Sequence, residues 1–303
     1  MTGASSGVGH ELCEQLLRKG YNVVAVARHK PEFHHANALC LSVDVTDANA
    51  VQHAVETALR HFGKIDVLSN NAGTSSYMSI EEESEEEMRS VMEINFWGSY
   101  HTMRALIPHF RQNQNGTIIN NSSECGLIGR AFGAAYCSSK FAIEGLTSSA
   151  RHELSRFCRV MSVNLSFFPG TRIGEGKKRK TQFQAYRGLS WLPVQVPPST
   201  STNHVRLAVA WIIAECEKKK IRRHLMLGAD IEHKVHYVIR ELTKDWHYSR
   251  LRARACGLPH AGTGGSKAGI YLRYAVYRVL SQLSWGVRKQ HYTELKRYFK
   301  RLI

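Results

Sequence analysis

The sequence predicts an α/β fold in which one doubly wound parallel sheet is covered by helices on both faces, giving three layers and a single domain. Two observations predict it. Short apolar runs rich in β-branched residues alternate with helical patterns from the start of the chain to about residue 230. Strands that alternate with helices are typical of βαβ units, which build parallel sheets. The 303 residues are enough for one such domain with a full hydrophobic core.

The strands are expected at short apolar runs, and the helices at the longer periodic segments between them. The strand runs are residues 23–27, 38–43, 65–70, 117–121, 162–168 and 224–227. The helical segments are residues 10–19, 48–61, 85–110, 136–156 and 203–219. Asp47 precedes the second helical segment and is expected to cap its N-terminus.

The later part of the chain departs from this alternation. Residues 171–201 combine a basic run at 177–180 with several prolines, so we expect a lid or substrate loop within a catalytic domain of residues 1–255. Residues 256–266 are rich in glycine and predict a linker. Residues 267–303 predict a basic helical C-terminal extension. We expect amphipathic helices over 270–303 that pack on a partner, a second subunit, a membrane surface or their own domain.

The chain is strongly basic, with a formal charge of +16 and a pI of about 9.7. Such a charge favours nucleic acid, an anionic membrane surface or acidic ligands as partners, whereas a solvated basic surface needs no partner. We prefer the solvated surface and do not expect nucleic-acid binding. Contact with a membrane surface through the C-terminal extension is kept as an alternative.

Cysteine usage and hydropathy bear on the location of the protein. The seven cysteines are scattered without a CxxC pair, which predicts reduced thiols and no metal site. No apolar run reaches the roughly 18–20 residues that a membrane span requires. Residues 1–9 do not resemble a secretory leader. We therefore expect a cytoplasmic protein, with peripheral membrane association as the alternative.

A glycine-rich stretch opens the chain and leads directly into the first helical segment. It reads TGASSGVG at residues 2–9, and an apolar run follows at residues 23–27. Glycines let a backbone turn tightly and approach a pyrophosphate, and the N-terminus of the helix then faces the anion. An ordinary turn is the alternative, but the βαβ spacing favours a Rossmann-type dinucleotide site. The candidate cofactor residues here are Gly3, Ser5, Ser6, Gly7, Val8 and Gly9.

Tyr136 and Lys140 are the strongest catalytic candidates. A spacing of four places both side chains on one face of a helix, about 5–6 Å apart at Cβ. A free tyrosine has a pKa near ~10, and a neighbouring ammonium lowers that pKa because it favours the phenolate. Such a tyrosine can exchange a proton with a carbonyl or hydroxyl oxygen, and Ser123 can hydrogen-bond the same oxygen. A surface Tyr–Lys pair at helical spacing is the alternative.

With further motifs, these features resemble the short-chain dehydrogenase/reductase family over about residues 1–230. The further motifs are Asp44, Asn70-Asn71-Ala72-Gly73, Asn95 and Pro169-Gly170. The resemblance implies that Tyr136 is the general acid/base and that Lys140 lowers its pKa and binds the nicotinamide ribose. It implies that Ser123 orients the substrate oxygen and that Asn95 holds a water linking Lys140 to solvent. Implied cofactor contacts are Asp44, Val45, Asn71, Ala72, Gly73, Tyr136, Lys140, Pro169, Gly170 and Thr171.

The end of the strand at residues 23–27 bears on the choice of cofactor. A carboxylate there binds a ribose 2′-hydroxyl and selects NAD(H), whereas a nearby arginine accommodates the 2′-phosphate of NADP(H). Ala27 stands at this position and Arg28 follows it. Because a guanidinium binds phosphate through charge-assisted hydrogen bonds, we favour NADP(H) over NAD(H). The alternative is that Arg28 merely faces solvent.

The resemblance implies an NADP(H)-dependent oxidoreductase that interconverts a hydroxyl and a carbonyl group on a small-molecule alcohol or ketone. Aromatic and apolar residues within 171–201 suit a bulky apolar substrate, such as a steroid-, retinoid- or acyl-like one, although a small substrate stays open. We also expect a homo-oligomer. The alternative is a catalytically silent nucleotide-binding protein that acts through its basic surface. The complete set of Asn95, Ser123, Tyr136 and Lys140 favours the enzyme.

The chain departs from the family pattern in four ways. It continues after residue 256, past the usual end of the family, and Gly174 stands where the family often has a threonine that contacts the carboxamide, which leaves the role of Thr171 open. Glu124 and Cys125 follow Ser123, where the family usually has small apolar residues, and this places a charge near the substrate mouth. The apolar strand that usually precedes the glycine-rich stretch is not found ahead of it. That strand is central in the expected order 3-2-1-4-5-6. We therefore expect the natural chain to begin upstream of Met1.

Overall fold

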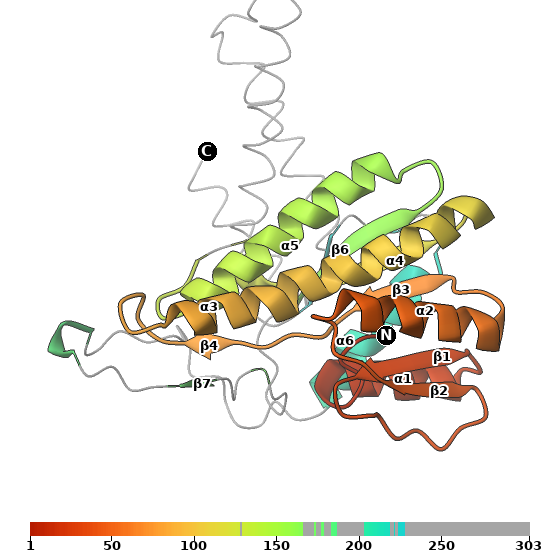
Figure 1. Ribbon diagram of the computed structural model, residues 1–303, viewed down its shortest axis with the longest axis horizontal. Helices are drawn as coiled ribbons and strands as arrows, with labels where there is room; N and C mark the ends of the chain where they lie inside the picture. The colour runs from red at the N-terminus through yellow and green to blue at the C-terminus, as the bar shows by residue number, and fades with distance from the viewer. Residues whose placement is uncertain are drawn as a thin grey trace, which may run out of the picture. The chain divides into compact units, whose positions relative to one another are not determined.

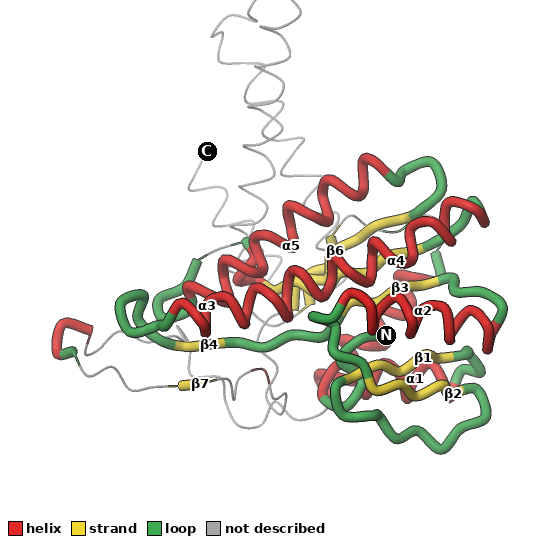
Figure 2. Tube along the Cα trace, viewed as in Figure 1, coloured by secondary structure: helices red, strands yellow, loops and turns green. Residues whose placement is uncertain are grey.

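The computed structural model describes residues 1–127, 129–165, 173, 177–178, 183–186, 203–218, 221 and 224–227 (Figure 1). Met1–Asp230 form one compact unit. The predicted linker at 256–266 and the predicted extension at 267–303 lie outside the described residues, as does most of the predicted lid. The helices and strands of the described part alternate along the chain (Figure 2).

All the predicted strands are present, and they run in parallel. The main strands are β1 (Val23–Ala27), β2 (Ala38–Ser42), β3 (Val67–Asn70), β5 (Thr117–Ser123), β6 (Arg159–Leu165) and β8 (His224–Leu227). β1 pairs with β2, and β3, β5, β6 and β8 follow one another in a second ladder. The short β4 (Ser76–Tyr77) pairs with β7 (Lys177–Lys178), which brings part of the predicted lid beside β4.

The two ladders are joined through Met1 and Thr2. The Val26 amide donates to the Met1 carbonyl at 2.9 Å, and the Thr2 amide donates to the Ser69 carbonyl at 3.1 Å. Thr2 also forms a parallel bridge with Val26 of β1. The start of the chain thus lies between β1 and β3, which matches the predicted doubly wound order. The expectation of a strand upstream of Met1 stays a prediction.

The helices cover the sheet where the periodic segments predict them, with one correction. They are α1 (Gly7–Arg18), α2 (Ala48–Phe62), α3 (Glu85–Met92), α4 (Gly98–Asn113), α5 (Ala134–Glu153) and α6 (Asn203–Cys216). Asp47 caps α2 as predicted, because its carboxylate accepts from the amides of Asn49 and Ala50. The single helix predicted over 85–110 is instead interrupted by a π-helical turn, η1 (Glu93–Trp97), where Asn95 is buried.

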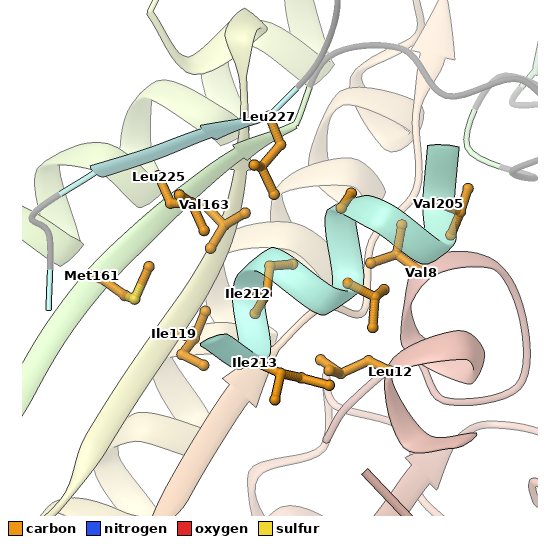
Figure 3. Close-up of a cluster of buried hydrophobic side chains, with 12 residues drawn as sticks. Val8, Leu12, Ile119, Met161, Val163, Val205, Ile212, Ile213, Leu225 and Leu227 are labelled. Carbon is orange, nitrogen blue, oxygen red and sulfur yellow. The ribbon is translucent and has the colours of Figure 1, made fainter. Parts of the chain in front are cut away.

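The core lies on both faces of the sheet, which confirms the predicted three layers. Ile119 of β5 packs with Val8 and Leu12 of α1 and with Ile212 of α6 on one face (Figure 3). Its neighbour Ile118 packs on the other face with residues of α2, α4 and α5. Successive strand residues point to opposite faces, so the near-continuous apolar runs in the sequence follow from burial on both sides.

A buried polar chain crosses the second face next to the carboxyl ends of the strands. The Thr102 hydroxyl donates to Asn70 Oδ1 at 2.6 Å, and Asn70 Nδ2 donates to Asn120 Oδ1 at 2.9 Å. Asn120 Nδ2 then donates to the Thr147 hydroxyl at 2.8 Å. Because each amide is paired, α4 and α5 are fixed against β3 and β5 without leaving unsatisfied polar groups.

Candidate active site

The glycine-rich stretch forms a tight loop between Thr2 and the N-terminus of α1. Gly3 and Gly7 have φ of 66° and 58°, which L side chains rarely adopt. A Cβ on Gly9 would lie 2.2 Å from the Gly3 carbonyl oxygen, so the loop closes on itself without room for a methyl group. The amides at this helix end face a position suited to an anion. The loop is thus a cradle that fits a pyrophosphate.

Three other residues of the stretch differ in which groups they expose to a ligand. Ser5 is exposed at the loop, whereas the side chain of Val8 is buried in the core against α6 (Figure 3). Any contact of Val8 with a cofactor therefore involves its backbone. Ser6 is half-buried at the position that precedes α1.

Asn71 and its neighbours hold this loop against β3. The Thr2 hydroxyl accepts from the amides of Asn71 and Ala72 at 3.0 Å each. Asn71 Nδ2 donates to the Gly3 carbonyl at 3.3 Å, and Asn71 Oδ1 accepts from Asn121 at 2.6 Å. The Asn71 amide is therefore engaged in positioning the loop. Its implied contact with a cofactor stays a prediction.

The structure brings Ser123, Tyr136 and Lys140 together at the carboxyl end of β5. Ser123 ends the strand, while Tyr136 and Lys140 lie in the first two turns of α5. Lys140 Nζ lies 5.6 Å from the centroid of the Tyr136 ring and donates to the Asn121 carbonyl at 2.9 Å. The side chains of all three are buried. This contradicts the alternative of a surface Tyr–Lys pair.

The ionisation of the pair differs from the sequence-based expectation. Burial raises the pKa of Tyr136 above its ordinary value, and the nearby Cys125 raises that pKa further, while a hydrogen bond with Ser123 opposes the shift. Burial lowers the pKa of Lys140 to about 8. Burial therefore outweighs any lowering of the Tyr136 pKa by Lys140 in this arrangement, and the predicted role of Lys140 stays a prediction. The ammonium bonds a backbone carbonyl and lies over the ring face, so burial of the phenol dominates.

Asn95 lies in the π-helical turn beside these residues. Asn95 Nδ2 donates to the Thr74 carbonyl at 3.0 Å and to the Ser139 hydroxyl at 2.8 Å, and Asn95 Oδ1 accepts from the Thr74 amide at 2.8 Å. A Cβ on Gly73 would be 3.3 Å from Asn95 Oδ1 and 3.8 Å from Lys140 Nζ. The amide thus fixes the segment after β3 against α5. The water that it was expected to hold stays a prediction.

Three of the predicted cofactor residues follow the ends of β1 and β2. Arg28 is exposed directly after β1, and its carbonyl accepts from the Ser42 hydroxyl at 2.7 Å. Asp44 is also exposed, while Val45 is buried, and a Cβ on Gly98 would lie 2.6 Å from Val45 Cγ2. Val45 therefore supports the start of α4. Pro169, Gly170 and Thr171 lie outside the described residues.

With this geometry described, comparison with known proteins decides the family. A family model for short chain dehydrogenases matches residues 1–182. The chain belongs to the short-chain dehydrogenase family.

Relatives and solved structures agree with this membership. The chain is 37% identical over 157 residues to a 3-ketodihydrosphingosine reductase of Bacteroides thetaiotaomicron, covering 52% of this chain and 58% of that protein. The chain spans about half the length of the curated relatives it matches.

Two solved structures are similar and contain a nicotinamide cofactor. A short chain dehydrogenase from Burkholderia cenocepacia in complex with NADP is 27% identical, with a TM-score of 0.61 and coverage of 83% of this chain and 94% of that chain. A 3-ketoacyl-(acyl-carrier-protein) reductase from Brucella melitensis complexed with NADH is 32% identical, with a TM-score of 0.53 and coverage of 55% and 73%.

Several residues of this short-chain dehydrogenase that shape the site were not predicted. Asn121 accepts from Lys140 and donates to Asn71, so it links the buried cation to the glycine-rich loop. Ser139 holds the Asn95 amide. The repeated asparagine pairs at 70–71 and 120–121 are the signal that could have found Asn121, because Asn70 and Asn120 are directly opposed in the sheet.

Two further findings among the described residues concern metal binding and membrane spans. Among them, no group of three or more His, Cys, Asp or Glu is placed to hold a metal ion. Nor does any helix in the described ranges combine the length and hydropathy needed to cross a membrane.

Proposed function

We propose that this short-chain dehydrogenase is an NADP(H)-dependent oxidoreductase that interconverts a hydroxyl and a carbonyl group. The observation that carries the proposal is the buried phenol of Tyr136, which is hydrogen-bonded with Ser123 and faces Lys140 across 5.6 Å. The glycine-rich loop supplies a cradle for the pyrophosphate of the cofactor, because Gly3 and Gly7 turn the backbone tightly just ahead of the N-terminus of α1. When bound, the reduced nicotinamide supplies the hydride.

The chain's own residues then handle the proton and the substrate oxygen. The raised pKa of Tyr136 keeps the phenol protonated at neutral pH, so it can donate to a carbonyl oxygen during reduction. Ser123 hydrogen-bonds the same oxygen and fixes its position. Below pH about 8 Lys140 is charged, and a buried cation stabilises the phenolate that forms. In the oxidative direction the same phenolate accepts the proton from a hydroxyl.

The choice between the two nicotinamide cofactors rests on Arg28. Its side chain is exposed at the end of β1, next to Ala27, and no carboxylate occupies this strand end. A guanidinium that binds the 2′-phosphate of NADP(H) contributes about 1.5–3 kcal/mol, or roughly 10–100-fold in affinity. We therefore propose a preference for NADP(H), with NAD(H) as the weaker cofactor.

We predict that Ala27→Asp combined with Arg28→Leu weakens or reverses this preference. The new carboxylate would repel the phosphate and hydrogen-bond the ribose of NAD(H) instead. The measurement is kcat/KM with NADPH and with NADH for both proteins. Arg18→Leu serves as a control, because Arg18 is also exposed but ends α1. Equal kcat/KM for the two cofactors in the unmodified protein would contradict the proposal.

A bulky apolar carbonyl compound is the substrate class that we propose. The ring of Tyr186, in the described part of the lid, contacts those of Phe132 and Phe183. Similarity to a 3-ketodihydrosphingosine reductase agrees with an acyl-like substrate. A panel of long-chain 3-keto compounds, steroid ketones and retinoid aldehydes, with short ketones for comparison, tests this through NADPH consumption. Higher kcat/KM for the short ketones would contradict it.

Three earlier expectations have no test among the described residues and stay predictions. They are the homo-oligomer, the cytoplasmic location and the membrane-surface contact of residues 267–303. The silent nucleotide-binding alternative predicts that the protein binds NADPH but does not consume it with any member of the carbonyl panel.

A further inference from the structure

Two cysteines face each other next to Tyr136. Cys125 lies in the 3₁₀ turn η2 (Glu124–Gly126), which directly follows Ser123, and Cys137 lies in the first turn of α5. Both side chains are buried, at 3% and 6% exposure, in one cluster with Tyr136. The two thiols interact within this cluster, and each has the largest influence on the pKa of the other. The turn that carries Ser123 and the helix that carries Tyr136 therefore meet at a pair of sulfur atoms.

The surroundings of the pair make the two thiols unequal. Cys137 is near the N-terminus of α5, and both the backbone and the guanidinium of Arg130 favour its thiolate. The interaction with the Cys125 thiol is the largest cause, and all three together lower the pKa of Cys137 to about 7. The interaction with Cys137 raises the pKa of Cys125 most, and burial and Glu124 raise it further. Cys125 thus keeps its proton and donates it to the Cys137 thiolate.

The other titratable groups that the described residues place around the pair are two tyrosines, one ion pair and the buried ammonium of Lys140, which interacts with Cys125. Tyr77 and Tyr136 face the cysteines, and burial raises the pKa of both phenols, so they stay neutral near pH 7. Glu124 is paired with Arg130 at 2.7 Å, and both side chains are nearly buried. The cation that favours the Cys137 thiolate is therefore held in place by a carboxylate of the η2 turn.

Cys137 is also reachable by a small molecule. It lines a cavity of ≈ 390 Å³ whose walls include Ala131, Phe132 and Phe141. A hydroperoxide needs far less space than this. Cys158 differs, because burial raises its pKa to about 11 and the thiolate is scarce at neutral pH.

We propose that Cys125 and Cys137 are an oxidisable dithiol that closes to a disulfide when a hydroperoxide enters this cavity. The Cys137 thiolate attacks the terminal oxygen of hydrogen peroxide, the O–O bond breaks, and the departing hydroxide takes a proton to become water. The Cys125 sulfur then displaces hydroxide from the Cys137 sulfenic acid, and its own proton completes a second water. In sum, two thiols and one peroxide give one disulfide and two waters.

The disulfide would link the two elements that carry the catalytic candidates. An S–S bond is about 2.0 Å long, which is shorter than any contact between two unbonded thiols. η2 and α5 must therefore move closer together when the bond forms. Ser123 and Tyr136, each within two residues of the bond, then leave the arrangement described above. This consequence for turnover rests on the proposed function, whereas disulfide formation itself does not.

The sequence offers a direct chemical test of the bond. Trypsin cuts after Arg111, Arg130 and Lys140, which yields peptides 112–130 and 131–140 with one cysteine each. The folded full chain is treated with hydrogen peroxide, its remaining thiols are alkylated, and the digest is analysed by mass spectrometry without reduction. We expect the two peptides as one linked species that separates on adding dithiothreitol. Its rate of formation should rise with pH through about 7, as the Cys137 thiolate forms.

Variants distinguish a specific pair from general oxidation. In Cys125→Ser, peroxide should leave Cys137 as a sulfenic acid that a dimedone probe labels, because no second thiol resolves it. Cys158→Ser is the matched control, since it removes another buried cysteine and should leave the linked peptide unchanged. Oxidation of the unmodified chain should also lower turnover until dithiothreitol restores it.

Two results would overturn the proposal. One is recovery of peptides 112–130 and 131–140 as separate alkylated species after peroxide treatment. The other is a dimedone adduct on Cys137 in the unmodified chain without any linked peptide. A linked peptide with unchanged turnover in an active enzyme would support the dithiol and contradict its effect on the site. A linked peptide in a protein that never turns over would support the dithiol and contradict the proposed function.

Discussion

Tyr136→Phe is expected to lower kcat by about 10²–10⁴-fold, the range that a general acid–base group supplies. The substitution removes the phenol oxygen and keeps the buried ring, so its packing against Cys125 of η2 should survive. Lys140 cannot replace the phenol, because its Nζ bonds the Asn121 carbonyl and lies 5.6 Å from the ring centroid. Nucleotide affinity should therefore change little while turnover is lost.

The measurement is kcat with the best carbonyl substrate, together with NADPH binding by fluorescence titration. Tyr77→Phe is the matched control. Its phenol is a second buried one near Cys125, and its hydroxyl donates to the Ile173 carbonyl at 3.2 Å. The Tyr77 variant should retain most of its turnover. A Tyr136 variant with near-normal kcat would contradict the assignment of the general acid.

Gly9→Ala is expected to abolish nucleotide binding and to destabilise the fold. The added Cβ would lie 2.2 Å from the Gly3 carbonyl and 2.5 Å from Asn71 Nδ2. The first of these is backbone, so the loop itself must move, and such overpacking costs about 1–3 kcal/mol. Because the displaced atoms form the proposed pyrophosphate cradle, we expect loss of the thermal stabilisation by NADPH as well as a lower melting temperature.

Gly145→Ala provides the same substitution where space is open. Gly145 is an exposed residue of α5, and nothing lies within 4 Å of its ideal Cβ. Alanine there should raise stability by about 0.5–1 kcal/mol, because glycine lowers helix stability. Thermal melts of both variants with and without NADPH give the comparison. If Gly9→Ala keeps both its melting temperature and its response to NADPH, the close packing of this loop does not matter.

Much of the fold follows from patterns that depend on local sequence. Buried parallel strands read as continuous apolar runs, and amphipathic helices read as periodic ones, so the β1 and β8 boundaries were predicted as found. The π-helical turn at Glu93–Trp97 was missed. It depends on the buried Asn95 amide, whose partners Thr74 and Ser139 are far away in the sequence. Tertiary contacts of this kind leave no local periodicity.

In the candidate site, too, features that depend on local sequence were predicted, and features that depend on tertiary contacts were not. The spacing of Tyr136 and Lys140 on one helix predicted their proximity, because i, i+4 geometry is local. The sign of the Tyr136 pKa shift was not predictable, since it depends on burial and on Cys125 from another element. The Cys125–Cys137 contact was missed for a related reason. The cysteines lie on separate elements, and their approach depends on how η2 packs against α5.

The proposed reaction is hydride transfer from NADPH to a carbonyl carbon, with proton delivery by Tyr136. The most direct measurement uses NADPH deuterated at the transferable position of the nicotinamide, with the carbonyl panel, and detects deuterium in the alcohol product by mass spectrometry. We predict one deuterium on the carbinol carbon with the unmodified chain and little product with Tyr136→Phe. Binding of NADPH without deuterated product from any carbonyl compound would contradict the account and favour a silent nucleotide-binding protein.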